Sequence, residues 1–89
     1  MYKNKTADGK NNICGTNIMF YRKRLTPHTS QRAFADKLQL MGLDLDKNAI
    51  LRIECGKRFV TDIELKCFAK LLNVTTDELL LERTPDCSP

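Results

Sequence analysis

The sequence predicts an all-α fold, a compact bundle of five short helices, and three observations support this prediction. In several segments, apolar residues recur at spacings of three and four, which is the period of a helix. Two capping boxes, each a threonine followed three residues later by a glutamate, mark helix starts at Thr61 and Thr75. No segment has the alternation of a convincing strand, and the sequence contains no internal repeat. Its 89 residues are enough for one domain with a single modest core.

Five helices are expected, separated by loops at proline, glycine and asparagine. They span residues 16–25, 31 to about 40, 46–56, 61 to about 72, and 75–81. Ser30 and Asp46 have the short polar side chains that cap helix N-termini, and Gly56 can adopt the left-handed conformation that ends a helix. The inward-facing residues are expected to be Ile18, Tyr21 and Leu25; Phe34, Ala35 and Leu38; Ala49, Ile50 and Ile53; and Leu65, Phe68, Ala69 and Leu72.

The predicted helix at 46–56 has two contrasting faces. Ala49, Ile50 and Ile53 form an apolar stripe that is suited to a core. The opposite face, at positions i, i+1, i+4 and i+5, carries Lys47, Asn48, Leu51 and Arg52. Such a helix is shaped to lie in a groove, but an ordinary amphipathic surface helix has the same pattern. This segment alone supports both interpretations equally.

The net charge of the chain is +4, but the charges are unevenly distributed. Residues 1–58 contain twelve Lys or Arg and five Asp or Glu, a net +7, whereas residues 59–89 contain three and six, a net −3. The basic excess therefore lies in the part of the chain that contains the helix at 46–56. A nucleic-acid-binding protein would place its excess positive charge in this way.

The two ends of the chain are expected to lie outside the folded domain, which we place at residues 16–83. Residues 1–15 are polar and rich in glycine and asparagine, so we expect a flexible N-terminal tail. Its lysines at positions 3, 5 and 10 are able to follow DNA phosphates, but a plain disordered tail is favoured over a specific minor-groove arm. Residues 84–89 contain two prolines and are expected to fray.

Several classes of protein are disfavoured by the composition. No apolar run approaches membrane-spanning length and the polar N-terminus lacks a signal-peptide core, so a cytoplasmic protein without membrane contact is expected. The four cysteines form no C-x-x-C pair and His28 is the only histidine, which predicts reduced thiols and no metal site. These cysteines are Cys14, Cys55, Cys67 and Cys87. The absence of paired carboxylates and of a glycine-rich phosphate loop argues against an enzyme, a cofactor or a small-molecule ligand.

Four groups of residues, in this order, carry a resemblance to a known family. They are Arg22 at the end of the first helix; Ser30-Gln31-x-x-Phe34-Ala35; Ile50-x-x-Ile53-Glu54-x-Gly56-Lys57; and L-x-x-F-A-K-L-L-N-V-T-x-D-E-L-L at 65–80. Residues 17–81 thereby resemble the helix-turn-helix DNA-binding family of phage repressors and Cro proteins, of the xenobiotic-response-element type. The resemblance implies a lambda-repressor-like domain whose third helix enters the major groove of DNA.

The resemblance also implies a role for each polar residue of this region. Base edges would be contacted by Lys47, Asn48, Leu51 and Arg52. Arginine pairs with guanine, asparagine pairs with adenine, lysine donates to guanine, and leucine meets a thymine methyl or is simply exposed. Phosphates would be bound by Gln31 with the N-terminus of its helix, and by Lys57 and Arg58. Arg22 and Glu54 match a family pair that forms a salt bridge; the alternative is two unrelated surface charges.

Three departures from the family pattern concern the loops and one helix end. Two extra residues lie between Arg22 and Gln31, and Cys55 occupies a position that is usually polar. The turn between the second and third helices is longer than the usual tight turn by about five residues. The docking angle of the third helix, and with it the set of base-contacting residues, depends on this turn.

The expected function is that of a sequence-specific DNA-binding transcriptional regulator, a repressor rather than an activator. A repressor needs only to occupy its operator, whereas an activator needs a surface for the polymerase. Double-stranded DNA is the expected partner, and Leu79, Leu80 and Leu81 would either form a homodimer contact or complete the monomer core. The alternative function is a protein-interaction module on the same fold, of the antitoxin or anti-repressor type. The basic residues in and after the third helix argue against that alternative: Lys47, Arg52, Lys57 and Arg58.

Overall fold

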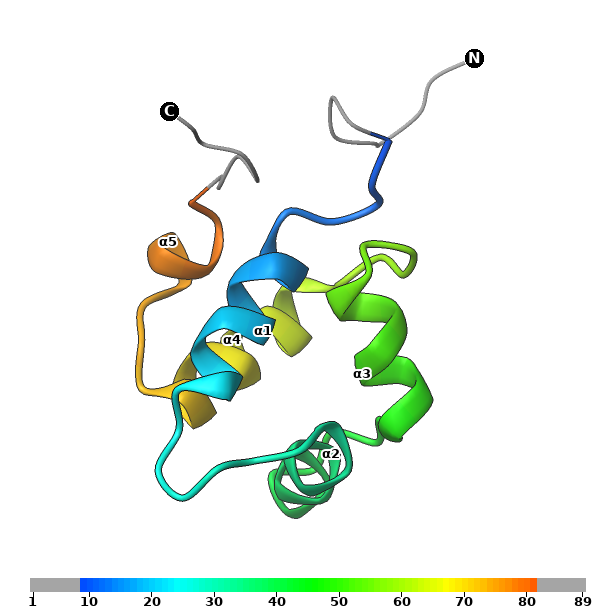
Figure 1. The fold of residues 1–89 in the computed structure, drawn as a ribbon. Coiled ribbons are helices and arrows are strands. Elements are labelled where there is room, and N and C mark those ends of the chain that lie inside the picture. The colour runs from blue at the N-terminus through cyan, green and yellow to red at the C-terminus, as the bar shows by residue number, and fades with distance from the viewer. Residues whose placement is uncertain (1–8, 82–89) are drawn as a thin grey trace.

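The computed structural model of the protein describes residues 9–81. Within this range the chain forms five α-helices and no strand, which confirms the all-α prediction there. The helices are α1 (Cys14–Lys23), α2 (Gln31–Leu40), α3 (Lys47–Glu54), α4 (Asp62–Leu72) and α5 (Thr76–Leu79) (Figure 1). In this part of the chain no helix combines the length and apolarity needed to cross a membrane. The predicted C-terminal tail at 84–89 and the first eight residues of the predicted N-terminal tail lie outside the described residues.

The helix starts that were predicted from capping residues are confirmed. The side-chain oxygen of Ser30 accepts a hydrogen bond from the backbone N–H of Ala33, and that of Asp46 accepts one from Ala49. In α4 and α5 the threonine hydroxyl accepts from the glutamate N–H, while the glutamate carboxylate accepts from the threonine N–H. These capping boxes are Thr61–Glu64 and Thr75–Glu78. Four helices therefore start where the sequence predicts, because the first-turn N–H groups find acceptors close by in the sequence.

A flexible tail was predicted to extend through residue 15, but the described residues 9–13 lead directly into the first helix. The first helix begins at Cys14, two residues before the predicted start, and Cys14 is only 2% exposed. The side-chain oxygen of Asn12 accepts a hydrogen bond from the N–H of Gly15 at 2.8 Å, which is the spacing of an N-cap contact. Because the asparagines here bond to backbone groups, their polar character does not keep the segment out of the fold.

The core lies between α1, α2, α3 and α4 and is closed by α5. The rings of Phe34 and Phe68 stack at its centre, with centroids 6.1 Å apart. Leu79 completes the core of the monomer, whereas Leu80 and Leu81 remain 43% and 59% exposed. Of the three leucines considered for a dimer contact, only these last two are therefore available. Among residues 9–81, the hydrophobic side chains without exposed surface are Ile18, Phe34, Leu38, Ile50, Ile53, Phe68 and Leu79.

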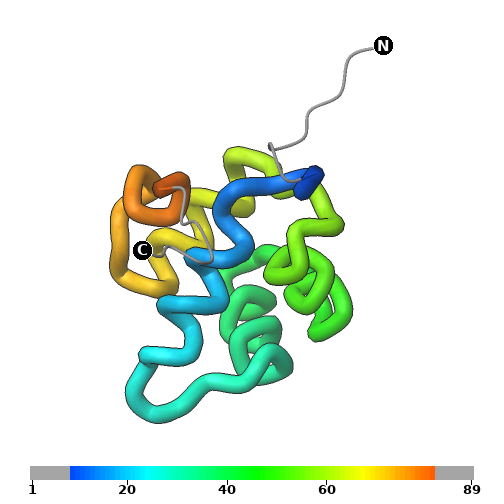
Figure 2. The backbone as a smooth tube through the Cα atoms, turned by 45° about the horizontal axis from the view of Figure 1, so that its top comes forward, coloured from blue at the N-terminus to red at the C-terminus, as the bar shows by residue number. Residues whose placement is uncertain are grey.

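The third helix lies at an edge of the molecule, packed against α1 and α2. In Figure 1, α2 is seen nearly along its axis whereas α3 runs across the view, so the two helices are steeply inclined to one another. The fourth helix packs on α1, α2 and α5, and both views place α5 on the opposite side of the molecule from α3 (Figure 2). One face of α3 is thus left uncovered by the other helices.

Candidate nucleic-acid interface

The outward face of α3 carries the four side chains that the resemblance assigns to base contacts. Lys47, Asn48, Leu51 and Arg52 are all exposed. Ile50 and Ile53 have no exposed surface, and because residues three apart share a helix face, their burial fixes which side of α3 points outward. Leu51 is 43% exposed, an apolar contact surface among polar neighbours. The structure therefore places this whole predicted set together on one solvent-facing side.

The connection between α2 and α3 consists of the six residues 41–46. A typical helix-turn-helix turn has about three to four residues, so the excess is two to three residues rather than the expected five. The connection is held by Leu45, which is 5% exposed, and by Gln39, whose side-chain amide donates to the carbonyl of Leu45 at 3.3 Å. This anchoring gives α3 a defined position relative to α2 in spite of the longer turn.

A hollow of about 370 Å³ lies between α2 and the start of α3. Its polar lining comes from both helices and from the loop between them: Arg32, Asp36, Gln39, Asp46, Lys47 and Asn48. No role was expected for Arg32 or Asp36 from the sequence. Their spacing of four residues, which places them on one face of α2 directly after Gln31, is the signal that would have identified them. Donors and acceptors are thus present beside Lys47 and Asn48.

A buried polar cluster joins the ends of three helices. The guanidinium of Arg22 donates to both carboxylate oxygens of Glu54, from Nε at 2.6 Å and from the second terminal nitrogen at 3.0 Å. Gln31 donates from its side-chain amide to the same carboxylate at 2.9 Å. This amide, which the resemblance assigns to a phosphate, is therefore engaged inside the protein.

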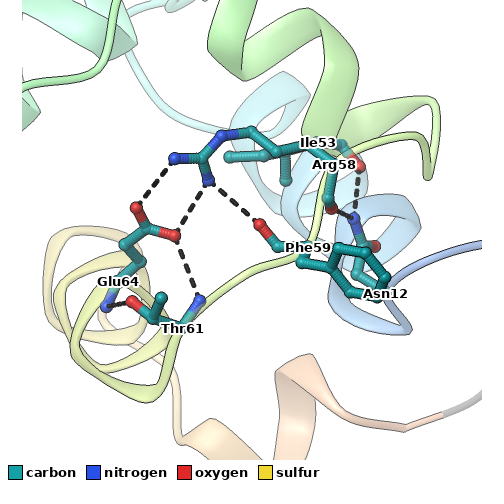
Figure 3. A network of polar contacts seen from close by, with 6 residues as sticks. All are labelled: Asn12, Ile53, Arg58, Phe59, Thr61 and Glu64. Atoms are coloured by element: carbon teal, nitrogen blue, oxygen red, sulfur yellow. Dashed lines mark hydrogen bonds and ion pairs between the residues drawn. The ribbon is translucent and has the colours of Figure 1, made fainter. Parts of the chain in front are cut away.

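The two basic residues after α3 differ in their surroundings. Lys57 is exposed, as a phosphate contact requires. Arg58 instead forms a two-point ion pair with Glu64, with distances of 2.9 and 3.0 Å, and also donates to the carbonyl of Phe59 (Figure 3). The hydrogen bond from Arg58, assisted by the N–H of Thr61, lowers the pKa of the Glu64 carboxyl, and the same pair raises the pKa of Arg58.

These contacts give Arg58 a structural role that was not expected from the sequence. Its guanidinium holds the loop after α3 to the start of α4, while the phosphate contact expected of it stays a prediction. The Arg58–Glu64 ion pair was not predicted from the sequence, because Glu64 was already assigned to the capping box of α4. The carboxylate serves both, since its two oxygens accept from Arg58 while one of them also accepts from the N–H of Thr61.

Two asparagines before α1 tie the N-terminal segment to the C-terminal end of α3. Asn11 donates from its backbone to the carbonyl of Gly56 at 2.7 Å and from its side chain to the carbonyl of Lys57 at 2.9 Å. The side-chain amide of Asn12 donates to the carbonyls of Ile53 at 3.1 Å and Arg58 at 2.7 Å, as Figure 3 shows. These residues are more than 40 positions apart in the sequence, and amide-to-carbonyl bonds leave no sequence pattern by which to predict them.

The thiols and possible metal ligands of the described residues show no cluster. Within residues 9–81 no three His, Cys, Asp or Glu side chains lie close enough to hold a metal ion. Burial raises the pKa of the Cys14 thiol to about 11, so it is protonated at neutral pH. Cys55 is exposed, Cys67 is half-buried, and all three of these cysteines are free thiols. Cys87 lies outside the described residues.

Comparison with known proteins does not place the chain in a family. No protein-family model, curated protein or solved structure matches it. The observations that bear on function are therefore the exposed face of α3, the hollow beside it, and the loops that hold its two ends.

Proposed function

We propose that this protein is a sequence-specific DNA-binding regulator of transcription that inserts α3 into the major groove. The observation that carries this proposal is the outward face of α3, which presents Lys47, Asn48 and Arg52 above the fully buried Ile50 and Ile53. A helix with its side chains is about 10–12 Å wide and the major groove is about 12 Å wide, so a helix at the edge of a domain fits it.

The chemistry of this face suits base recognition. Arg52 can donate two hydrogen bonds to O6 and N7 of a guanine, and Asn48 can pair with N6 and N7 of an adenine. Lys47 donates to guanine, and the exposed Leu51 can contact the methyl group of a thymine. Each of these pairings distinguishes one base pair from the others in the major groove. A face with these donors supports recognition of sequence as well as of charge.

Phosphate contacts are proposed on both sides of α3. On one side, Arg32 of α2 lines the hollow beside the start of α3. On the other side, Lys57 is exposed just after its end, on a loop that the Arg58–Glu64 pair and Asn11 hold in place. Contacts that flank a recognition helix fix its register on the duplex.

We propose repression and not activation, because an activator would also need a surface that contacts the polymerase. A repressor acts by occupying its operator, and the chain resembles phage repressors and Cro proteins in residues 17–81. We propose that it acts as a homodimer on a palindromic site, since two recognition helices one helical turn apart multiply the discrimination of one. The exposed Leu80 and Leu81 at the end of α5 supply an apolar surface for that contact.

A second candidate function is a protein-interaction module of the antitoxin or anti-repressor type. Leu40 is 89% exposed at the end of α2 and Leu51 is 43% exposed on α3, and such leucines suit a protein partner. The exposed Lys47, Arg52 and Lys57 around α3 favour DNA over that alternative.

The proposal is tested by selecting bound sequences from a pool of random DNA duplexes with the purified protein. A shared motif in the bound fraction is the expected result, and a pool that stays random after repeated rounds would overturn sequence-specific binding. In parallel, the dissociation constant is measured against salt. With about four to six phosphate contacts per protomer, the slope of log K against log salt is expected to be about −4 or steeper. A flat response excludes DNA as the partner.

A further inference from the structure

The side-chain amide of Asn12 joins two helix ends that are far apart in the sequence. Its nitrogen donates to the carbonyl of Ile53, in the last turn of α3, at 3.1 Å and to the carbonyl of Arg58, in the loop after α3, at 2.7 Å. Its oxygen accepts from the N–H of Gly15, in the first turn of α1, at 2.8 Å. The amide therefore uses both of its N–H groups and its oxygen, and Figure 3 shows the two bonds that it donates.

The start of α1 lies directly against this end of α3. A Cβ at Gly15 would lie 1.9 Å from the carbonyl oxygen of Ile53, so the absence of a side chain there permits the close approach. The last carbonyls of a helix have no partner in a following turn. That of Ile53 accepts from the N–H of Gly56 at 3.0 Å and also from Asn12, which adds a bond from outside the helix.

The other end of α1 holds the neighbouring residue of α3. Arg22 donates to the carboxylate of Glu54 at 2.6 Å, one position after Ile53. Successive residues of a helix lie about 100° apart around its axis, so the two anchors act on different sides of α3. With Arg22 near one end of α1 and Asn12 before the other, the last turn of α3 is fixed in rotation as well as in position.

The rotation of α3 decides which side chains can reach base edges. Lys47, Asn48 and Arg52 are exposed on one side of this helix. Side chains that recognise a ligand must be held within about 0.5 Å and 10–20° of the productive geometry. A residue that fixes the rotation of α3 therefore influences which DNA sequence is bound without contacting a base.

We propose that Asn12 is a positioning residue for sequence discrimination, because its amide sets the angle at which α3 meets the base pairs. This inference rests on the proposed DNA-binding function. The bond to the carbonyl of Arg58 also holds the loop that carries Lys57, so the same amide positions the proposed phosphate contact after α3. Asn12 itself makes no DNA contact in this scheme.

The test uses two variants that keep an acceptor for the N–H of Gly15 and remove the donor to α3. Asn12→Ser leaves a hydroxyl that can accept this bond but is too short to reach the carbonyls of Ile53 and Arg58. Asn12→Asp keeps the shape of the side chain and replaces the donating nitrogen by an oxygen. Leu71→Ala is the control, because Leu71 packs against the core from α4, which contacts α1, α2 and α5. Its loss lowers stability away from α3.

The readout is a ratio of two dissociation constants measured by fluorescence anisotropy. One is for a mixed-sequence duplex, and the other is for a duplex of equal length that carries the motif selected by the unmodified protein. The negative charge added by Asn12→Asp acts on the phosphates of both duplexes alike, so by itself it leaves the ratio unchanged. Circular dichroism melting curves identify a temperature at which each variant is folded. A residue with a merely structural role would alter the melting temperature and not the ratio.

Both Asn12 variants are expected to lower the ratio about tenfold, which is the cost of about one mismatched base pair. For Asn12→Ser the change should lie in the dissociation constant for the selected motif, while that for mixed-sequence DNA stays the same. Leu71→Ala is expected to melt at a lower temperature and to retain the full ratio. If one of the Asn12 variants does not fold, the other decides the test.

Three outcomes separate this inference from the function on which it rests. A ratio that the folded Asn12 variants leave unchanged would overturn the positioning role and keep the proposed function. An equal fall in Leu71→Ala would also overturn it, because a general loss of stability would then explain the effect. A pool of random duplexes from which the unmodified protein selects no motif would remove both proposals.

Discussion

Arg22 of α1 and Glu54 of α3 form a buried ion pair, 2.6 Å from Nε to Oε2, with side chains only 7% and 2% exposed. The remaining guanidinium nitrogen of Arg22 donates to the carbonyl of Thr29 at 3.0 Å, and Gln31 adds its amide to the carboxylate. The pair therefore connects the end of α1, the loop before α2, the first residue of α2 and the end of α3. It sets the position of the proposed recognition helix relative to the rest of the fold.

Removing one partner of this pair should destabilise the fold more than removing both. Arg22→Met or Glu54→Met alone leaves a buried charge without its counter-ion, and each is expected to lower the free energy of unfolding by about 3–5 kcal/mol. The double variant replaces both charges by apolar side chains and should lose less than either single variant. Urea denaturation of all four proteins gives the coupling energy of the double-mutant cycle. Additive effects would show that the two side chains contribute independently.

The Arg58–Glu64 pair predicts a dependence of stability on pH. Because the folded protein holds the pKa of Glu64 below its ordinary value of 4.5, the ionised carboxylate contributes stability above that pH. The contribution is lost as the pH falls below 4.5 through the lower pKa of the folded state. At neutral pH, the free energy of unfolding of Glu64→Gln should therefore be lower than that of the unmodified protein. The expected difference is about 1 kcal/mol, because the Arg58 side chain is 32% exposed and solvent weakens the ion pair. In acid, the free energies of unfolding of the two proteins should become equal.

Urea denaturation of both proteins across the acidic range measures this convergence. Asp62→Asn is the control, because it removes an exposed carboxylate from the same first turn of α4 and leaves the pair with Arg58 intact. The control is expected to show a smaller difference. A stability gap between the unmodified protein and Glu64→Gln that does not change with pH would mean that the shape of the side chain, and not its charge, holds the loop.

Gly15→Ala tests the close approach of α1 and α3. A Cβ at this position would lie 1.9 Å from the backbone carbonyl oxygen of Ile53, which no side-chain movement can relieve. Alanine is favoured over glycine in a helix by about 0.8–1 kcal/mol, so an unhindered substitution would stabilise the protein. The clash is expected to reverse the sign and destabilise it by about 1–3 kcal/mol, measured by thermal and urea denaturation. A stabilised variant would show that the two helices are not in contact here.

The local structure of this fold was largely predictable, because its signals lie within a few residues of one another. Ser30, Asp46 and the threonines of both capping boxes each bond to a backbone group three residues on. The stripe containing Ile50 and Ile53 likewise predicted which face of α3 would be buried. The Arg22–Glu54 contact was expected only through the resemblance, since its partners are 32 residues apart.

The contacts that could not be predicted are those in which a side chain had several possible partners. Gln31 and Arg58 were assigned to phosphates, but each lies beside a buried carboxylate, which attracts a donor more strongly than solvent does. Asn11 and Asn12 looked like tail residues because asparagine is common in loops, and their acceptors are carbonyls at the far end of α3. Local composition cannot identify such acceptors before the helices are placed.

Arg52 and Asn48 are expected to be the residues that recognise the DNA sequence. Both are exposed on the side of α3 opposite Ile50 and Ile53, so they approach base edges only if α3 lies in the major groove. Arg52→Ala should weaken binding to the selected site by about 1–3 kcal/mol and scarcely change binding to mixed-sequence DNA. Asn48→Ala should relax the preference at a single adenine-containing position. Repeating the duplex selection with each variant, and with Lys66→Ala as a control, measures both effects. If both variants select the original motif with unchanged affinity, recognition must come from other residues, such as Lys47 and Leu51 on α3 or Arg32 in the hollow beside it.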